Sequence, residues 1–457
     1  MFLYYLPLIV TVSAAVICFA ANDKISKILT LISASVSIPV SLYIWVLNSV
    51  STQFLYIDAI SKIMLVTISI IYLTTSIFSG SYFKHIPKPL LKKNLYWAFL
   101  NLFVLSMFFS VMVNNLGLIW IGIEATTITS ALLVAIDNNF PSIEASWRYI
   151  IIVSVGLVIS LVGIIFIYDQ THTLNIANML KNHASESRII LIGSAMAIVG
   201  FGTKAGIFPM HTWLPDVHGR SIAPVSAIFS SVLLPSALFG IIRISQIAPF
   251  EDIKQFMFIL GILTIVFASI FMINQKYYKR MFAYSSMENM GMILIGISLG
   301  KAGLLGAMIL LISHAFAKSS VFYLTGNILS AYKTRKIAHV YSLVKNMPYT
   351  AYGLILSSLA VTGAPPFAIF IGEFFIISAV YLIYGFAYVI SILLALLTAF
   401  LAINYKVAKM SFSERKSTQK TKDEWVSALI PLINLTLSFC VLFAIPAINN
   451  ILKGITG

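Results

Sequence analysis

The chain has 457 residues, of which 59% are hydrophobic and only 10% are charged, and its mean hydropathy is +0.95. This composition excludes an ordinary soluble domain and is typical of an integral membrane protein. The net charge of +15 could indicate a nucleic-acid partner, but its placement along the chain indicates a membrane topology instead.

Apolar stretches long enough to cross a bilayer recur along the whole chain. We expect them to form α-helices, because lipid offers no hydrogen-bond partners to the backbone and the stretches are too long for barrel strands. The sequence therefore predicts an all-α polytopic membrane protein with about 14 transmembrane helices, and the connections leave no room for a soluble domain. The expected spans are 2–20, 28–48, 59–80, 95–113, 116–136, 148–168, 188–208, 222–246, 253–273, 281–299, 302–329, 350–380, 385–408 and 426–451.

Basic residues are distributed unevenly between the two sides of this expected topology. Alternating loops place 21 of the 30 lysines and arginines on one side and seven on the other, with Lys204 and Lys318 inside spans. The richer side is cytoplasmic by the positive-inside rule. We therefore expect both termini outside, a cytoplasmic loop at 409–425 that carries the basic run from Arg415 to Lys422, and a prokaryotic plasma membrane as the location.

Four charged residues lie inside long apolar runs: Glu124, Lys204, Lys318 and Glu373. A charged side chain at the bilayer centre costs about 2.5–3.5 kcal/mol on insertion scales, so such residues usually face a protein interior or a water-filled path. One interpretation is a set of structural ion pairs that lock helices together, for example Glu373 with Lys406. The interpretation that we favour is a path for protons, since both residue types titrate.

Two spans carry glycine and proline beside an ionisable residue, at 202–209 near Lys204 and at 362–367 before Glu373. Proline breaks helical hydrogen bonding, and a break at membrane depth is tolerated only inside protein or along a cavity. We expect two discontinuous helices, each the fourth span of a five-helix block, at 95–246 and 253–408. Because five is an odd number of crossings, the two blocks would have opposite orientations in the membrane, as in an inverted repeat. Two independent kinks are the simpler alternative.

Several titratable residues lie close to these positions. Lys204 is the expected partner of Glu124, and a change in their separation would change the proton affinity of the lysine. His314 and Lys318 share one helix face at spacing i, i+4, where histidine can relay protons. The segment from Pro209 to His218 adds His211 and His218 to the candidates, as relay residues or as loop polarity, and has too few ligands for a zinc site. No metal site or cofactor motif is expected.

Together these residues resemble the antiporter-like proton-channel family. It comprises large membrane subunits of respiratory complex I, of energy-converting hydrogenases and formate hydrogenlyases, and of multisubunit cation/proton antiporters. The resemblance runs from Tyr56-Ile-Asp58 to Glu373. Its motifs are Gly-Ile-Glu124, Gly-Thr-Lys204-Ala-Gly, Pro-Met-His211-Thr-Trp-Leu-Pro-Asp-Val-His218, Tyr278-Lys279-Arg280-Met-Phe-Ala-Tyr-Ser-Ser, His314-Ala-Phe-Ala-Lys318 and Pro365-Pro366-Phe.

The resemblance implies two inverted five-helix bundles and a single proton channel. By position, Glu124 and Lys204 match the family's glutamate–lysine pair, Lys318 matches the lysine that links the half-channels, and Glu373 matches the terminal ionisable residue. With glutamate at that last position, the chain looks most like component F of hydrogenase-4. Pro235 stands where complex I members usually place a bridging lysine, which puts pumping, though not the fold, in question.

The expected function is a proton-translocating membrane subunit of a redox-driven complex. It would have no active site of its own, and its partners would be other membrane subunits and a peripheral arm with metal clusters. The alternatives are a subunit of a multisubunit sodium/proton antiporter and a scaffold that has lost conduction. The expected domains are an N-terminal three-helix segment (1–94), two half-channels (95–246 and 253–408), and a cytoplasmic loop with a C-terminal helix (409–457).

Overall fold

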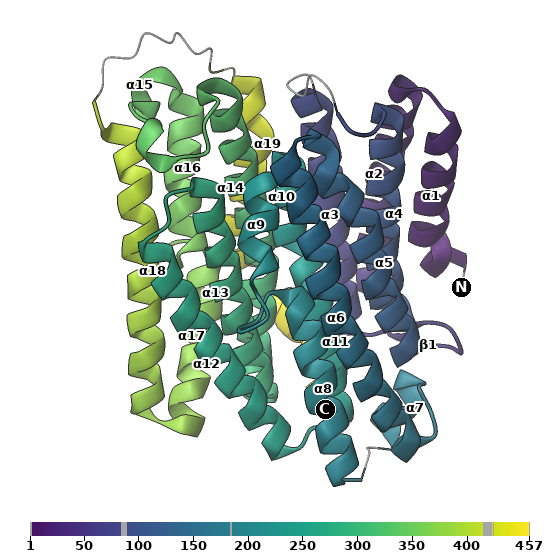
Figure 1. Cartoon of the computed structure of the whole chain (residues 1–457). Coiled ribbons are helices and arrows are strands. Elements are labelled where there is room, and N and C mark those ends of the chain that lie inside the picture. The colour runs from purple at the N-terminus through teal and green to yellow at the C-terminus, as the bar shows by residue number, and fades with distance from the viewer. Residues whose placement is uncertain (1, 84–88, 183–184, 415–422, 424, 457) are drawn as a thin grey trace.

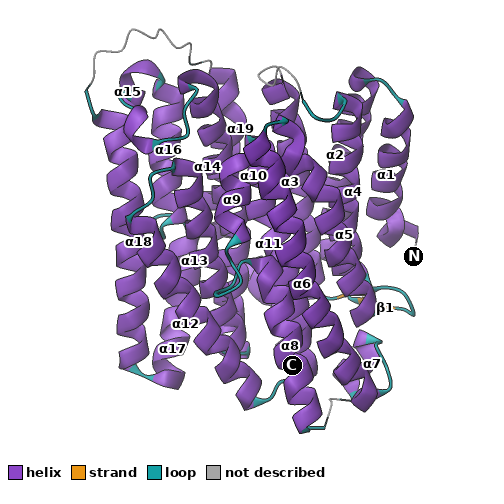
Figure 2. Ribbon diagram, viewed as in Figure 1, coloured by secondary structure: helices purple, strands orange, loops and turns teal. Residues whose placement is uncertain are grey.

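The structure is a computed structural model, and it describes residues 2–83, 89–182, 185–414, 423 and 425–456. These residues form one bundle of long helices that run roughly along a common axis (Figures 1 and 2). The basic run from Arg415 to Lys422 lies outside the described residues.

The N-terminal segment consists of three long helices and a small hairpin. Its elements are α1 (Phe2–Ala20), α2 (Asp23–Val46), β1 (Val50–Ser51), β2 (Tyr56–Ile57) and α3 (Ala59–Tyr82). β1 and β2 pair antiparallel, with Val50 opposite Ile57. α3 begins where it does because the Asp58 side chain accepts a hydrogen bond from the Ser61 amide.

The segment that follows contains the first block of five expected spans. Its elements are α4 (Lys93–Met112), α5 (Leu116–Val134), η2 (Ala135–Asp137), α6 (Phe140–Thr171), α7 (Ile176–Lys181), α8 (Arg188–Ala205), α9 (Trp213–Arg220), α10 (Ala223–Ile228), η3 (Phe229–Leu233) and α11 (Leu234–Ile247). α10, the π-helical turn η3 and α11 form one continuous span that is buried except at Ser245 and Gln246 near its end.

The second block and the C-terminal helix complete the bundle. Their elements are α12 (Glu251–Ile273), α13 (Tyr278–Ser298), α14 (Lys301–Tyr332), η4 (Ile337–His339), α15 (Leu343–Asn346), α16 (Pro348–Val361), α17 (Ala368–Tyr384), α18 (Phe386–Phe412) and α19 (Trp425–Thr456). α19 packs along α14 and also contacts α3, so it connects the second block to the N-terminal segment.

Twelve helices of the described chain are long and apolar enough to cross a membrane, so the chain is an integral membrane protein. α13 is also long, but it carries Lys279, Arg280 and Glu288, and α16 and α17 are shorter apolar helices. Counting α13 as one crossing and α16 with α17 as another would give fourteen. The all-helical membrane fold is confirmed, whereas the count of fourteen and the inverted repeat stay predictions.

The two expected breaks are present. α8 ends at Ala205, where Gly206 adopts the left-handed conformation with φ 77°, and α9 starts seven residues later at Trp213. α16 ends at Val361, Gly363 has φ 67°, and α17 starts at Ala368. Each break therefore places its ionisable residue beside irregular backbone inside the bundle.

Glycines allow the helices of both blocks to approach closely. Gly163 of α6 meets the backbone of α8 at Gly193, and Gly306 of α14 meets α17 at Gly372. A side chain at any of these positions would collide with the facing backbone. In each block the third span thus packs tightly against the broken fourth span, which fixes the positions of Lys204 and Glu373 relative to their neighbours.

Several helices begin earlier than the hydrophobic pattern predicts. α6 starts at Phe140 instead of 148, because Asn139 and Ser142 form a capping box. α13 starts at Tyr278 instead of 281, and Lys279 is not a loop residue: it is fully buried and donates to the Ser221 carbonyl at 2.7 Å. Arg243, which the loop count placed outside, is buried as well.

The Arg243 guanidinium makes a two-pronged ion pair with Asp58, with N–O distances of 2.7 and 2.8 Å. It also donates to Ser61 at 3.0 Å and to Gln246 at 2.8 Å. Because both charges are buried and bonded on several sides, the pair ties the start of α3 to the end of α11.

Candidate functional site

Lys204 occupies the last turn of α8 and is completely buried. Its ammonium group donates to the Tyr149 hydroxyl at 2.5 Å and to the Thr127 hydroxyl at 2.8 Å. It also lies 4.7 Å from the centre of the Tyr149 ring. The Tyr149 hydroxyl in turn contacts Ser130 at 2.9 Å. The lysine is therefore held by neutral hydroxyl groups from α5 and α6.

Glu124 does not contact Lys204 directly. The Thr127 hydroxyl donates to the Glu124 carboxylate at 3.4 Å while it accepts from Lys204, so it bridges the two residues. Ser154 of α6 donates to the other carboxylate oxygen at 2.8 Å. The predicted partnership of Glu124 and Lys204 is thus realised through a third side chain.

Glu124 is also less enclosed than its place in an apolar helix indicates, since its side chain is half-buried. A mainly apolar groove of about 520 Å³ lies between α5 and α6 and reaches Thr127 and Ser154, the two hydroxyl partners of the carboxylate. In the cluster formed by Glu124, Thr127, Tyr149 and Lys204, which we call the Lys204 cluster, Glu124 therefore approaches the flank of the bundle and Lys204 lies in the interior of the bundle.

Aromatic rings separate the Lys204 cluster from the centre of the bundle. Phe229 of η3 lies between Tyr149, at a ring distance of 5.9 Å, and His218, at 6.3 Å. His218 of α9 is fully buried and stacks on Phe322 at 4.9 Å, and both of its ring nitrogens lack a hydrogen-bond partner among the described residues. Unpaired buried nitrogens of this kind are sites that ordered water fills.

His211 belongs to the break between α8 and α9 and lies closer to the surface than His218. It is 6% exposed and stacks between Phe208 and Phe271 at ring distances of 5.7 and 5.5 Å. Its Nδ1 has no partner in the described part of the chain. The predicted histidine segment is therefore not one site, because its two histidines face different surroundings.

Pro235 shapes the central link between the two blocks. In the π-helical turn the Leu234 amide bonds to the Phe229 carbonyl, and Pro235 has no amide hydrogen to offer. The Ser230 carbonyl is therefore left without a backbone donor in its own helix, and His314 Nε2 lies 3.3 Å from it. Pro235 thus leaves a backbone acceptor facing a buried histidine.

Lys318 lies one turn beyond His314 on α14 and is completely buried. Its ammonium donates to the Phe282 carbonyl of α13 at 3.1 Å, and the Ser286 hydroxyl donates to the same carbonyl. Ser286 also contacts the Ser230 hydroxyl at 2.6 Å. A short polar chain therefore joins η3 to Lys318.

Glu288 of α13 is a buried carboxylate that the sequence analysis missed. It is 2% exposed, and its charge interacts with those of both Lys318 and Glu373. The Asn289 amide donates to Glu288 at 3.2 Å and to the Val361 carbonyl, at the end of α16, at 3.4 Å. Glu288 therefore lies between the central lysine and the second helix break.

Glu373 lies in the second turn of α17 and is 6% exposed. Its carboxylate rests against Gly363, so that any side chain at Gly363 would collide with it. Lys406 does not pair with it, because that ammonium donates to the Met272 and Ile273 carbonyls at 2.6 and 2.7 Å and caps α12. Among the described residues no ion pair includes Glu124, Lys204, Lys318 or Glu373, so the geometry does not support structural ion pairs at these positions.

Six of the seven predicted residues fall into two groups, and His211 lies apart from both. Glu124 and Lys204 form one hydroxyl-bridged cluster, and His218, His314, Lys318 and Glu373 follow one another across the centre, with Glu288 added. The charges of His218 and His314 interact with that of Lys318. Thr127, Tyr149 and the serines were missed because uncharged hydroxyls are common in membrane helices and carry no signal of their own. Glu288 lies inside the expected span 281–299 and meets the same criterion as the four residues that were chosen.

Comparison with known proteins places the chain in a family. Residues 113–402 match the family described as "NADH:quinone oxidoreductase/Mrp antiporter, TM". A hydrogenase-4 component F homolog from Methylacidiphilum infernorum is 31% identical over 420 residues, which cover 86% of each chain. The likeness to hydrogenase-4 component F that the motifs predicted is confirmed.

Two solved structures have the same fold. A chain of the membrane-bound sulfane sulfur reductase, an archaeal respiratory membrane complex, superposes with a TM-score of 0.89 at 23% identity and covers 99% of this chain and 96% of that one. A chain of the Mrp complex from Dietzia sp. DQ12-45-1b gives 0.88 at 17% identity, with coverage of 99% and 97%. The chain therefore belongs to the family of NADH:quinone oxidoreductase and Mrp antiporter transmembrane subunits.

Proposed function

We propose that this chain is a proton-translocating membrane subunit of a redox-driven complex, of the hydrogenase-4 or complex I kind. It carries no reaction centre of its own in this proposal. Its partners are other membrane subunits and a peripheral arm with metal clusters, as the names of its relatives suggest. The chain itself supplies the path for the proton through the bilayer.

One observation carries the proposal: titratable side chains follow one another from the half-buried Glu124 on α5 through fully buried residues to Glu373 on α17. Desolvated lysines, histidines and carboxylates near one another can pass a proton when their charges or separations change. A hydroxyl group joins Glu124 to Lys204, and hydroxyl groups and backbone carbonyls connect η3 with His314 and Lys318. Several histidine nitrogens and serine hydroxyls beside these residues have no partner among the described residues. Ordered water at those atoms would complete the path.

The two blocks are proposed as half-channels, 95–246 and 253–408, flanked by the N-terminal segment 1–94 and the C-terminal segment 409–457. The proton would enter or leave each half beside its broken helix, at Lys204 and at Glu373. Within the first half, Phe229 separates Lys204 from His218, so a proton would pass from Lys204 toward the second half only when water or a side-chain rotation bypasses that ring.

An antiporter subunit is the alternative, since the family includes Mrp proteins. The hydrogenase-4 component F homolog, which matches nearly the full length of this chain, favours the redox-driven assignment. The proteins that purify with the chain discriminate between the two. Hydrogenase or quinone-reductase subunits support the redox complex, and small antiporter subunits alone contradict it.

The basic loops are proposed to face the cytoplasm and both termini the outside. In Figure 1, α19 ends at the C mark near the bottom, while α15 and the connection that carries Lys333, Arg335 and Lys336 lie at the top. A reporter fused at Gly457, which lies outside the described residues, should be active outside the cell. A cytoplasmic signal there would contradict this orientation.

The direct test is proton translocation in vesicles that contain the assembled complex with Lys204→Ala or Glu124→Ala. We expect both variants to assemble and to lose most of the proton flux, because the cluster passes a proton and does not hold helices together by an ion pair. Assembly is followed by co-purification of the partner subunits. A variant that assembles and moves protons at the wild-type rate would refute the role of that residue.

A further inference from the structure

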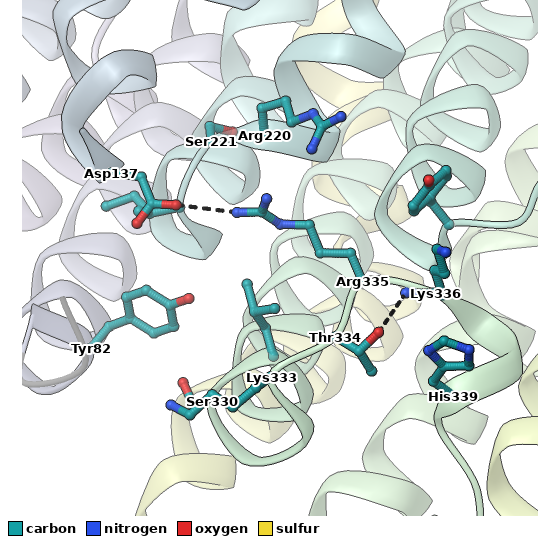
Figure 3. Close-up of a pocket in the computed structure, with 13 residues that line it drawn as sticks. Tyr82, Asp137, Arg220, Ser221, Ser330, Lys333, Thr334, Arg335, Lys336 and His339 are labelled. Atoms are coloured by element: carbon teal, nitrogen blue, oxygen red, sulfur yellow. Dashed lines mark hydrogen bonds and ion pairs between the residues drawn. The ribbon is translucent and has the colours of Figure 1, made fainter. Parts of the chain in front are cut away.

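A second feature, apart from the buried path, is a cavity of about 530 Å³ at the end of the bundle where the basic loops lie. It opens where α3 and α14 end, beside the C-terminal end of α9 and the start of α13 (Figure 3). None of the seven predicted path residues lines it. A space of this size holds a small polar group together with water molecules of its hydration shell.

Positive charge predominates in the lining of this cavity. Four cationic side chains, Arg220, Lys333, Arg335 and Lys336, face one carboxylate, Asp137. Arg335 extends toward Asp137 and pairs with it at 3.2 Å (Figure 3). In the part of the chain that the structure describes, the side chains of Arg220, Lys333 and Lys336 have no ion-pair or hydrogen-bond partner. Three positive charges therefore remain uncompensated around one concave space.

Lysines that are scattered over a cytoplasmic surface need no ligand to explain them, because they set the membrane topology and water weakens the repulsion between their charges. Here the cations are gathered around a hollow whose walls exclude part of the solvent, and such walls strengthen the field inside. The arrangement disfavours a cation and favours an anion.

The polar groups of the lining are hydrogen-bond donors of the kind that bind phosphate. Arginine presents a planar fork that matches two phosphate oxygens, and lysine acts as a point charge. The Thr334 hydroxyl accepts from the Lys336 amide at 3.2 Å, which leaves its own hydrogen free to donate into the cavity. Ser330 lines the same wall.

We propose that this cavity binds a phosphate-bearing anion through Arg220, Lys333 and Lys336. Basic pockets between transmembrane helices on the cytoplasmic side are sites for anionic phospholipid headgroups, and the cavity lies at the level where the long helices end. A soluble phosphate ester presents the same chemistry. The site is independent of proton transfer, because its lining residues do not belong to the series of titratable residues from Glu124 to Glu373.

The test uses the purified full-length chain in detergent and native mass spectrometry. Phosphatidylglycerol, phosphatidylcholine and glycerol 3-phosphate are titrated separately against wild type and against the double variant Arg220→Gln/Lys333→Gln. The matched control is Lys92→Gln/Lys93→Gln, which removes the same charge from two exposed lysines at the start of α4, outside the cavity. Melting temperatures confirm that each variant is folded.

Each cation near the membrane surface contributes about 1 kcal/mol to binding an anionic lipid, so loss of two should weaken binding about 30-fold. We expect that loss for phosphatidylglycerol in the cavity variant only, and no such loss in the control. If the cavity variant instead loses affinity for glycerol 3-phosphate to the same extent, and wild type does not bind phosphatidylglycerol more tightly than glycerol 3-phosphate, the result would support the same site with a soluble ligand. Equal binding by both double variants, or no binding of either phosphate probe above phosphatidylcholine, would overturn the proposal.

If the double variant cannot be recovered in folded form, the single charge reversal Lys333→Glu replaces it. Lys333 lines the cavity and is exposed, so this change should leave packing intact. Because these measurements need neither partner subunits nor proton flux, their failure would not affect the proposed function.

Discussion

The hydroxyl of Thr127 is the one atom that joins Glu124 to Lys204, and removing it should interrupt proton transfer in the first block. Thr127→Val keeps the branched shape of the side chain and deletes only that hydroxyl. Lys204 then loses one of its two hydroxyl partners, and Glu124 keeps only Ser154. Among the described residues, no other side chain forms hydrogen bonds with both the carboxylate and the ammonium.

The size of the effect follows from the burial of Lys204. A hydrogen bond to a charged group contributes about 1.5–3 kcal/mol, and Lys204 is fully enclosed, so water does not replace the lost partner easily. If this loss falls on the transfer step, proton flux decreases roughly 10- to 150-fold. The assay is the initial rate of proton translocation in vesicles with the assembled complex, together with the melting temperature of each variant.

Thr126→Val is the matched control. Thr126 is equally buried on the same helix, but its hydroxyl donates to the Ile123 carbonyl of its own turn at 2.6 Å and touches neither charge. Thr127→Ser should retain most of the flux, because it keeps the hydroxyl. If Thr127→Val translocates protons as fast as Thr126→Val, the bridge has no part in transfer and the reasoning is wrong.

The remaining predictions concern the Asp58–Arg243 ion pair and the membrane topology. Asp58→Asn should lower the melting temperature at neutral pH, since breaking a buried ion pair costs about 3–5 kcal/mol; a melting temperature equal to that of wild type would contradict this role. Burial opposes charge on Asp58, but the Arg243 guanidinium outweighs it and holds the pKa of that carboxyl below its usual range. The pair therefore stabilises the fold above about pH 4 and loses its effect as the pH falls through the lowered pKa, so melting curves of Asp58→Asn and wild type should converge at acid pH. The variant Lys254→Cys places a thiol on the side opposite the basic loops, and we expect a thiol reagent to reach it from outside the cell. Reaction from the cytoplasmic side alone would contradict the proposed topology.

The positions of the helices were largely predictable, because hydrophobic length is a strong signal and lipid allows few alternatives. Glycine and proline beside Lys204 and Glu373 also located both breaks correctly. The starts of the helices were harder to predict. Charged residues such as Glu144 and Arg148 look like loop residues, yet they form an i, i+4 ion pair on the first turns of α6.

The site was predictable only where a charge marks it. Glu124, Lys204, Lys318 and Glu373 stand out because a charge in an apolar run is expensive. The bridging role of Thr127 depends on how α5 faces α6 and α8, and a single sequence does not contain that information. The Ser230 carbonyl, which faces His314 instead of a backbone donor, is a similar case. Pro235, which removes that donor, is visible in the sequence, but the π-helical turn that accommodates the proline is not.

The burial of Lys279 and Arg243 illustrates the opposite error. Both residues lie near the ends of expected spans, where basic side chains usually reach the headgroups, and the loop count treated them as surface residues. The structure gives each of them a specific acceptor, the Ser221 carbonyl and the Asp58 carboxylate. Tertiary contacts therefore decide between an interfacial anchor and a buried cation.

The central claim, that protons move along the buried series, is tested most directly at Glu373. Glu373→Gln preserves shape and volume but cannot take up and release a proton, and the structure gives this carboxylate no ion pair to lose among the residues it describes. Proton translocation and melting temperature are measured on the same assembled complex in vesicles, with Glu373→Asp as the control that keeps the acid. The account predicts a Gln variant that melts like wild type and does not translocate protons, and an Asp variant that retains part of the flux. A Gln variant that translocates protons at the wild-type rate would contradict it.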